Sequence, residues 1–174
     1  MTGRPDRREQ IVTVARGLLE DDGPEALTMR NLASAMGIKA PSLYKHVKNR
    51  HEIETLLSER ALAEIGQDLA AAAVASRSRG LESVGSAYRA WAKANPELYR
   101  LATSIPLDRE AITEGIEQSA EAPLLHALDS DRDRARACWA LAHGLVILEL
   151  NDRFPPGADI DAAWRSGISA MSPR

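Results

Sequence analysis

Cysteine, aromatic residues and β-branched runs are all scarce in this chain. Cys138 is the single cysteine among 174 residues, which excludes an internal disulfide framework and favours a reducing compartment. Aromatic residues make up 4% of the chain, and Ile11–Val14 is the only sizeable run rich in β-branched residues. Alanine, leucine, arginine and glutamate dominate instead. This composition predicts an all-α protein.

Long apolar runs are also missing. The longest, Cys138–Leu150, has 13 residues and is interrupted by His143 and Glu149. It is too short to span a bilayer and is typical of a buried helix. The first ten residues are polar and charged, unlike a secretory signal. The sequence therefore predicts a cytoplasmic protein with no membrane partner.

The motifs of enzymes and metal sites are absent. The four histidines form neither a His-x-x-x-His pair nor a Cys/His cluster, so no metal site is expected. Cys138 and His143 would lie roughly 140° apart around one helix, too far to act as nucleophile and base. Asp129–Asp133 hints at a calcium loop, but the required glycine is missing and Ala140 occupies the twelfth position. Without a Gly-rich phosphate loop as well, we expect no catalytic residue, no metal and no cofactor.

Acidic residues are missing from one stretch, Thr28–Arg50, which carries five basic residues in a chain with 22 Lys+Arg and 25 Asp+Glu. Residues 1–50 carry nine Lys+Arg and six Asp+Glu, a net charge of +3. Residues 51–174 carry 13 and 19, a net charge of −6. Such asymmetry alone can arise by chance, but an acid-free basic block is a candidate polyanion-binding surface.

The basic block is also predicted to form two short helices around a tight turn. A first helix from about Asp6 to Asp21 precedes it. Thr28 is a good N-cap for the second helix, and Gly37 suits a left-handed position after it. Pro41 fits the first turn of a very short third helix that ends near Val47. This arrangement predicts a helix-turn-helix.

The rest of the chain is predicted to form six more helices, and we find no convincing strand pattern. Residues 1–50 are expected to form a DNA-binding domain, and residues 51–174 a helical ligand-binding and dimerisation domain. The first is a long helix that Asn49 and Glu52 open and that runs to about Ala75, followed by a break at 75–80. Next come a helix carrying Val84 to Trp91, a helix capped by Asn95 that runs through Thr103, and a helix from about Asp108 to Leu128 that Pro123 kinks or splits. The last two are a helix that Ser130 opens and that runs to about Asn151, and a helix capped by Asp159.

Several short motifs lie in a fixed order near the N-terminus. They are Ile11-Val12-x-Val14-Ala15, Gly23-Pro24-Glu25-Ala26-Leu27-Thr28, Arg30-Asn31-Leu32-Ala33, Met36-Gly37-Ile38 and, most specific, the decapeptide from Pro41 to Arg50. In order, spacing and position they resemble the tetracycline-repressor (TetR) family of bacterial transcriptional regulators, over about Arg7–Leu57. The resemblance implies a helix-turn-helix head on a helical body, a recognition role for the third helix, and a place at the bacterial nucleoid.

The predicted DNA-binding residues follow from this segment. Leu43 and Val47 are expected to pack inward and leave their neighbours facing the groove. The resemblance implies contacts with the DNA backbone for Tyr44, His46 and Lys48. Arg30 and Lys39 or Lys45 are the better candidates for base edges, because long cations can reach guanine acceptors. The full set is Thr28, Arg30, Lys39, Ala40, Pro41, Ser42, Tyr44, Lys45, His46, Lys48 and Arg50. Four of them have an ordinary alternative: packing for Tyr44, a helix-terminal cation for His46, and surface charge for Lys48 and Arg50. Arg4, Arg7 and Arg8 form either a DNA-contacting arm or a solvated terminus.

The predicted eighth helix is apolar nearly all round. Trp139, His143, Val146 and Ile147 lie on one side, and Leu141, Leu145 and Leu148 lie on another. A helix with two apolar sides needs cover on both, so one side is expected to meet a symmetry partner, with the last helix beside it. This resembles the dimerising four-helix bundle of the family, and a two-fold dimer suits a palindromic operator.

Trp139-Ala-Leu-Ala-His143-Gly144 further resembles a Trp-His-Gly motif found in one group of C-terminal domains of the family, and 95–101 fits the same group. Body domains of the family commonly hold an inducer cavity, and the candidate lining is Tyr88, Trp91, Tyr99, Trp139 and His143. The alternative for each of these residues is an ordinary core position.

Together these patterns predict a repressor that binds double-stranded DNA as a homodimer and is released by an unknown small molecule. The lining is poor in charge, so an apolar or aromatic ligand is expected. A regulator with the same head but without a small-molecule inducer is the first alternative. A helical ligand-binding protein or enzyme that has lost DNA binding is the second, and the acid-free basic block argues against it.

Overall fold

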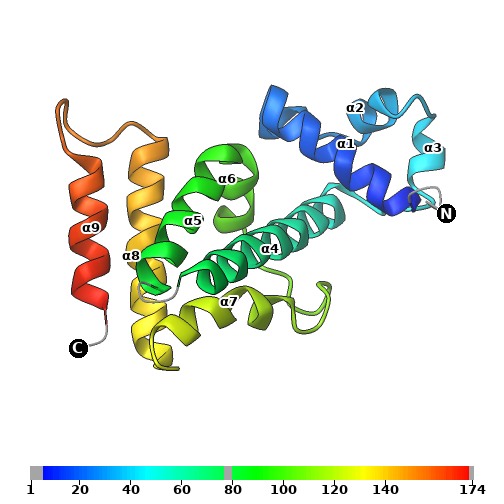
Figure 1. Cartoon of the computed structure of the whole chain (residues 1–174). Helices are drawn as coiled ribbons and strands as arrows, with labels where there is room; N and C mark the ends of the chain where they lie inside the picture. The colour runs from blue at the N-terminus through cyan, green and yellow to red at the C-terminus, as the bar shows by residue number, and fades with distance from the viewer. Residues whose placement is uncertain (1–5, 77–79, 173–174) are drawn as a thin grey trace. The chain divides into compact units, whose positions relative to one another are not determined.

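The computed structural model describes residues 6–76 and 80–172, and every regular element in these ranges is a helix. The chain divides into two compact units. Unit 1 contains residues 1–61 and 95–114, and unit 2 contains residues 62–94 and 115–174. The elements are α1 (Arg7–Asp22), the 3₁₀ turn η1 (Pro24–Ala26), α2 (Met29–Ala35), α3 (Ala40–Leu43), α4 (Arg50–Ala75), α5 (Gly80–Ala94), α6 (Pro96–Ser104), α7 (Ile116–Ala127), α8 (Arg132–Leu150) and α9 (Ile160–Met171) (Figure 1).

Unit 1 is organised around α1. Ile11, Ala15 and Leu19 recur at helical spacing and are fully buried. The helix stops at Gly23, whose φ of 78° suits a residue without a side chain. Both ends of α1 lie within one residue of the prediction.

The two short helices of unit 1 begin where their capping residues predict. The Thr28 hydroxyl oxygen accepts a hydrogen bond from Asn31 N at 3.1 Å and caps α2. Gly37 has a φ of 64°, as the left-handed turn after α2 requires. α3 is shorter than predicted, because regular helix ends at Leu43 and the chain tightens through a turn that brings His46 N to Leu43 O at 2.9 Å. Val47 still re-enters the core.

The predicted opening of α4 is confirmed, with a difference in detail. Glu52 N donates to Asn49 Oδ1 at 2.9 Å. The Glu52 carboxylate reaches Lys48 N at 2.7 Å, one residue before the position of an ordinary capping box. From this start α4 runs to Ala75, as predicted. The predicted break after it lies largely in 77–79, outside the described residues.

Two predictions for the middle of the chain are wrong. The Asn95 side chain does not cap α6, because it accepts a hydrogen bond from Arg16 instead. α7 begins at Ile116 and not near Asp108, because Gly115 has a φ of 85° that interrupts the helix. Asp108 O closes only a short turn with the amides of Ala111 and Ile112.

In unit 2, α8 packs against α5, α7 and α9, and it runs antiparallel to α9 (Figure 1). Its N-cap is Asp131 and not Ser130, because Ser130 takes a φ of 64° while the Asp131 carboxylate accepts from Arg134 N at 3.0 Å. The buried stripe of α8 consists of Ala135, Cys138, Ala142 and Val146. Burial raises the pKa of the Cys138 thiol.

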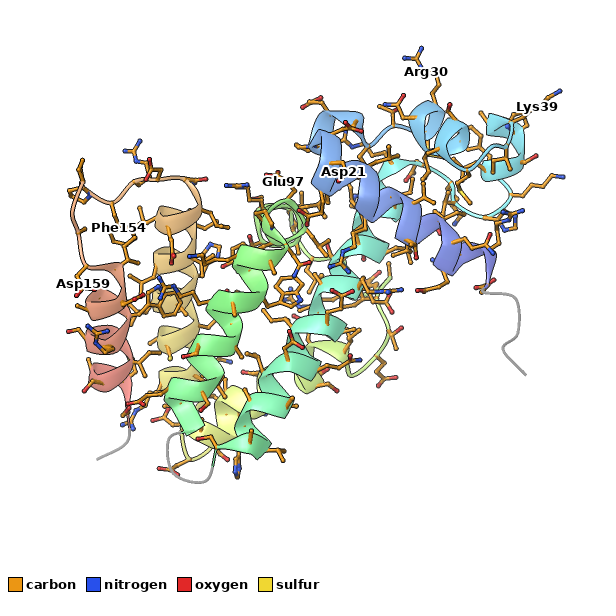
Figure 2. The ribbon with its side chains drawn as sticks, turned by 45° about the horizontal axis from the view of Figure 1, so that its top comes forward. Asp21, Arg30, Lys39, Glu97, Phe154 and Asp159 are labelled. Atoms are coloured by element: carbon orange, nitrogen blue, oxygen red, sulfur yellow. The ribbon has the colours of Figure 1, made fainter. Side chains whose placement is uncertain are left out.

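The cap predicted for α9 is confirmed, since Asp159 Oδ1 accepts from Ala162 N at 2.8 Å (Figure 2). A Cβ placed on Gly167 would lie 3.0 Å from Leu141 Cδ2. A glycine at this position therefore lets α9 approach α8 closely. Among the described helices, none is long and apolar enough to cross a membrane.

Candidate nucleic-acid interface

Most of the predicted DNA-binding residues lie on the outside of α2, α3 and the turn after α3. We call these residues the α2–α3 surface. Eight are exposed: Arg30, Lys39, Pro41, Ser42, Tyr44, Lys45, His46 and Lys48. Thr28, Ala40 and Arg50 are half-buried. Arg30 and Lys39 both project outward from the head (Figure 2). The structure therefore brings this set together on the outer side of two packed helices.

The inner side of the same helices explains why these residues face outward. Leu32, Leu43 and Val47 are almost completely buried. Tyr44, the next residue after Leu43, is 53% exposed and follows the helix in the αR conformation. Packing is therefore not the main role of this aromatic side chain.

The cations of the α2–α3 surface differ in how their charge is compensated. Among the described residues, no carboxylate forms an ion pair with Arg30, Lys39, Lys45 or Lys48. Arg50 Nε, in contrast, lies 2.7 Å from Glu54 Oε1. Four cations can thus meet a polyanion without breaking an internal pair, and binding phosphates with them would release condensed counterions.

Two of the three cations of the predicted N-terminal arm, Arg7 and Arg8, lie in α1. Arg7 lies in the first turn of α1 and donates to Gln10 Oε1 at 3.0 Å. Arg8 pairs with Glu52 Oε1 at 3.2 Å and so ties α1 to the start of α4. Arg4 lies outside the described residues. Neither described cation of the arm extends away from the head.

The predicted ligand residues belong to both units of the chain. Tyr88 and Trp91 are buried along α5 in unit 2, and Tyr99 is buried in α6 in unit 1. Trp139 and His143 do meet on α8, with ring centroids 6.4 Å apart, but Trp139 is 54% exposed. Burial lowers the pKa of His143, which favours its neutral form. A common lining for all five residues remains a prediction.

Sequence reasoning missed a charge network in unit 2. Glu149 of α8 has a side chain only 9% exposed, and it accepts from Arg89 Nε at 2.8 Å and from Lys93 Nζ at 2.6 Å, both on α5. Arg89 also reaches Asp161 of α9 at 2.6 Å, and its guanidinium stacks 5.5 Å from the centroid of the Trp164 ring. Arg89 and Lys93 are four residues apart and so lie on one face of α5, and this spacing was the sequence signal that could have indicated the network.

Opposing effects set the pKa of Glu149. Burial raises it, but the hydrogen bonds from Arg89 and Lys93, with their positive charges, outweigh burial and lower the pKa to about 2. The same contact with Glu149 raises the pKa of Arg89. The network joins α5, α8 and α9 through ion pairs.

Family comparisons match this chain in two segments. The family described as "Bacterial regulatory proteins, tetR family" matches residues 11–53. The family described as "Tetracyclin repressor-like, C-terminal domain" matches residues 81–171, more than half of the chain. Neither description mentions the Trp-His-Gly group, which stays a prediction.

Individual relatives fit the same family. The HTH-type transcriptional regulator Rv0681 of Mycobacterium tuberculosis is 31% identical over 156 residues, which cover 82% of this chain and 70% of that protein. The class E tetracycline repressor protein of Escherichia coli is 39% identical over 56 residues, 32% of this chain and only 26% of that protein.

A solved structure extends the likeness over the whole fold. The multidrug binding protein EbrR, complexed with imidazole, has a TM-score of 0.70 at 19% identity, and the match covers 98% of this chain and 97% of that one. The two relatives are named as a transcriptional regulator and a repressor. The chain belongs to the tetracycline-repressor family of DNA-binding transcriptional regulators.

Proposed function

We propose that this regulator is a repressor that binds a palindromic DNA operator as a homodimer and is released by a small apolar or aromatic molecule. The observation that carries DNA binding is the α2–α3 surface, where four cations have no carboxylate partner among the described residues. A helical protein that has lost DNA binding would have no use for such a surface. The family and the lack of a membrane-spanning helix in the described part fit a place at the bacterial nucleoid.

In this proposal α3 is the recognition helix, and residues 1–50 act as the DNA-binding domain. Arg30, Lys39 and Lys45 are the candidates for base edges, because their long side chains are exposed and free of carboxylate partners. Tyr44 and Lys48 are the candidates for phosphate contacts that fix the register on the duplex. Arg50, which Glu54 holds, is the weakest candidate of the set.

Losing one phosphate contact should weaken binding to all sequences alike. For Lys48→Ala we expect the slope of log K against log salt to become shallower by roughly 1, because one fewer counterion is released. Arg165→Ala removes a cation of α9 that pairs with Asp159, and it is the control that should leave the slope unchanged. Binding titrations over a series of salt concentrations measure both. An unaltered slope in Lys48→Ala would exclude its phosphate role.

Losing a base contact should act differently. For Arg30→Ala or Lys45→Ala we expect relaxed preference at one base pair of the operator, at a cost of roughly 1–3 kcal/mol. Selection and sequencing of bound duplexes identifies the operator and reads this preference in the same experiment. If both variants keep the original base preference, readout proceeds through DNA shape.

The proposed dimer uses the sides of α8 and α9 that their own unit leaves open. On α8, Trp139 and Leu148 are exposed, while His143 and Ile147 are half-buried. A Cβ placed on Gly144 would have no atom within 4 Å, so a partner helix can approach closely there. Two heads related by a two-fold axis would engage half-sites about 34–36 Å apart, which is why a palindromic operator is proposed.

The proposed inducer binds in the helical body. EbrR, whose fold this chain shares, is named as a multidrug binding protein, and this supports a ligand site of related character here. Tyr88, Trp91, Tyr99, Trp139 and His143 remain the candidate contacts, with few charges among them. A ligand shifts the regulator away from DNA only by the difference between its affinities for the two states.

Removing a ligand contact should abolish release while DNA binding persists. We expect Trp91→Ala and His143→Ala to bind DNA as tightly as the unmodified chain and to lose the response to a ligand that releases it. Release assays with a ligand identified by thermal-shift screening measure this. Normal release in both variants would remove these residues from the site, and a body that binds no ligand would favour a regulator without an inducer.

A further inference from the structure

Helix α6 begins on a cap that comes from another helix. Pro96 has no N–H, so Glu97 and Leu98 carry the first free amides of α6. Both donate to the Glu20 carboxylate of α1, Glu97 N at 3.2 Å and Leu98 N at 2.9 Å. A negative charge at a helix N-terminus also interacts favourably with the helix dipole. Glu20 thus provides the cap that the α6 sequence itself does not.

A second side chain of α1 holds the same place. Arg16 donates to Asn95 Oδ1, and Arg16 and Glu20 are four residues apart on one face of α1. Leu98 and Tyr99 are buried, and α6 packs against α1. We call Arg16, Glu20 and the segment 95–98 the α1–α6 clamp. Its hydrogen bonds each have one charged partner, and such charge-assisted bonds are stronger than bonds between neutral groups.

The clamp lies where the chain re-enters unit 1. Residues up to Ala94, the last of α5, belong to unit 2, and residues 95–114 belong with 1–61. Only Asn95 separates α5 from α6. The clamp therefore holds the residues that directly follow α5 in the chain.

We propose that the clamp makes α6 part of one cooperative folding unit with α1–α3, so that DNA binding and the stability of α6 are linked through Glu20. This rests on the proposed DNA binding. Binding to a folded unit stabilises every segment that opens only together with that unit. The linkage is reciprocal, so a change that destabilises the start of α6 weakens the hold of the head on DNA. Glu20 acts here as a positioning residue, away from the α2–α3 surface.

Amide hydrogen exchange of the full chain tests the link. The probe is an arbitrary duplex of about 30 base pairs at low salt, which the α2–α3 surface binds whatever its sequence, at about 100 times its Kd. In the unmodified chain, exchange in α1–α3 and in 96–104 should slow together, by up to about 100-fold. In Glu20→Ala, the slowing should persist in α1–α3 and disappear in 96–104, while DNA affinity changes by less than about threefold.

Matched variants separate this role from local support of the helix. Asp21→Ala removes the adjacent acid of α1, which has no hydrogen-bond partner among the described residues, and it should keep the link (Figure 2). Glu20→Gln keeps an acceptor oxygen and should retain part of the link between DNA binding and exchange in 96–104. A purely local cap would speed exchange at Glu97 and Leu98 without altering the effect of DNA on 96–104.

The outcomes that contradict the proposal are distinct. If DNA slows amide exchange in 96–104 of Glu20→Ala as much as in the unmodified chain, the proposal is wrong. Slowing confined to α1–α3 in the unmodified chain would overturn it as well. Absence of slowing in α1–α3 would refute the proposed DNA binding itself, and the clamp proposal with it. If Glu20→Ala does not fold, Arg16→Met carries the same test, because it removes the hydrogen bond to Asn95 from the clamp.

Discussion

Replacing Glu149 by Gln should lower the free energy of unfolding by about 3–5 kcal/mol, because the change leaves Arg89 and Lys93 without their shared charge partner. The Glu149 side chain is nearly buried and accepts from both cations. Asp161→Asn is the matched comparison, since Asp161 also pairs with Arg89 but is mostly exposed. Its effect should be much smaller. Chemical denaturation of both variants measures the two losses, and equal losses would show that burial of Glu149 does not matter.

The same carboxylate should make stability depend on pH in a definite window. Its pKa is about 2 in the folded chain and 4.5 ordinarily, so folding favours the ionised form. The contribution, about 3 kcal/mol, is fully present above pH 4.5 and is lost as the pH falls toward 2.

Glu149→Gln removes this one titration and retains the others. The difference in unfolding free energy between the two proteins should therefore shrink between pH 4.5 and pH 2. A difference that stays constant over that range would mean that the low pKa of Glu149 is not what stabilises the fold.

Leu148→Glu should convert the proposed dimer into a folded monomer and weaken operator binding by orders of magnitude. Leu148 is 43% exposed within its own chain, so a charge there costs little until a partner covers it. Leu145 is a poorer choice, because its side chain lies close to Gly167 of α9 and a charge there would disturb the fold itself. Sedimentation and circular dichroism together distinguish dissociation from unfolding.

Val74→Glu is the control for this test. Val74 is 86% exposed at the end of α4, so the same apolar-to-acid change should leave the mass of the assembly unchanged. A Leu148→Glu protein that remains dimeric would place the interface elsewhere. A monomeric unmodified chain at micromolar concentration would remove the dimer from the proposal.

Features that depend on neighbouring residues were predictable from the sequence. Thr28 and Asp159 cap α2 and α9 because a side-chain oxygen at this position reaches an amide three residues along. Gly37 marks a left-handed turn for a similarly local reason. The outward-facing basic residues followed from the same patterns, because the buried positions of α2 and α3 set which side chains remain outside.

Features that depend on distant residues were not predictable. Nothing near α6 indicates that Glu20, 77 residues earlier, accepts its first amide hydrogen bonds. At α8 two adjacent candidates competed, and backbone conformation selected Asp131 over Ser130. Aromatic residues at helical spacing fit a core as well as a pocket, so the spacing of Tyr88 and Trp91 does not decide between the two.

The buried position of Cys138 makes the chain convenient for spectroscopy. Its thiol is shielded and its pKa is raised, so it reacts slowly with maleimides and similar reagents. A cysteine introduced at an exposed position can therefore take a spin label or a dye while the native cysteine stays in place. In a two-fold assembly, one such substitution at Lys39 would carry two probes, and the distance between them would report directly whether the heads match one turn of DNA.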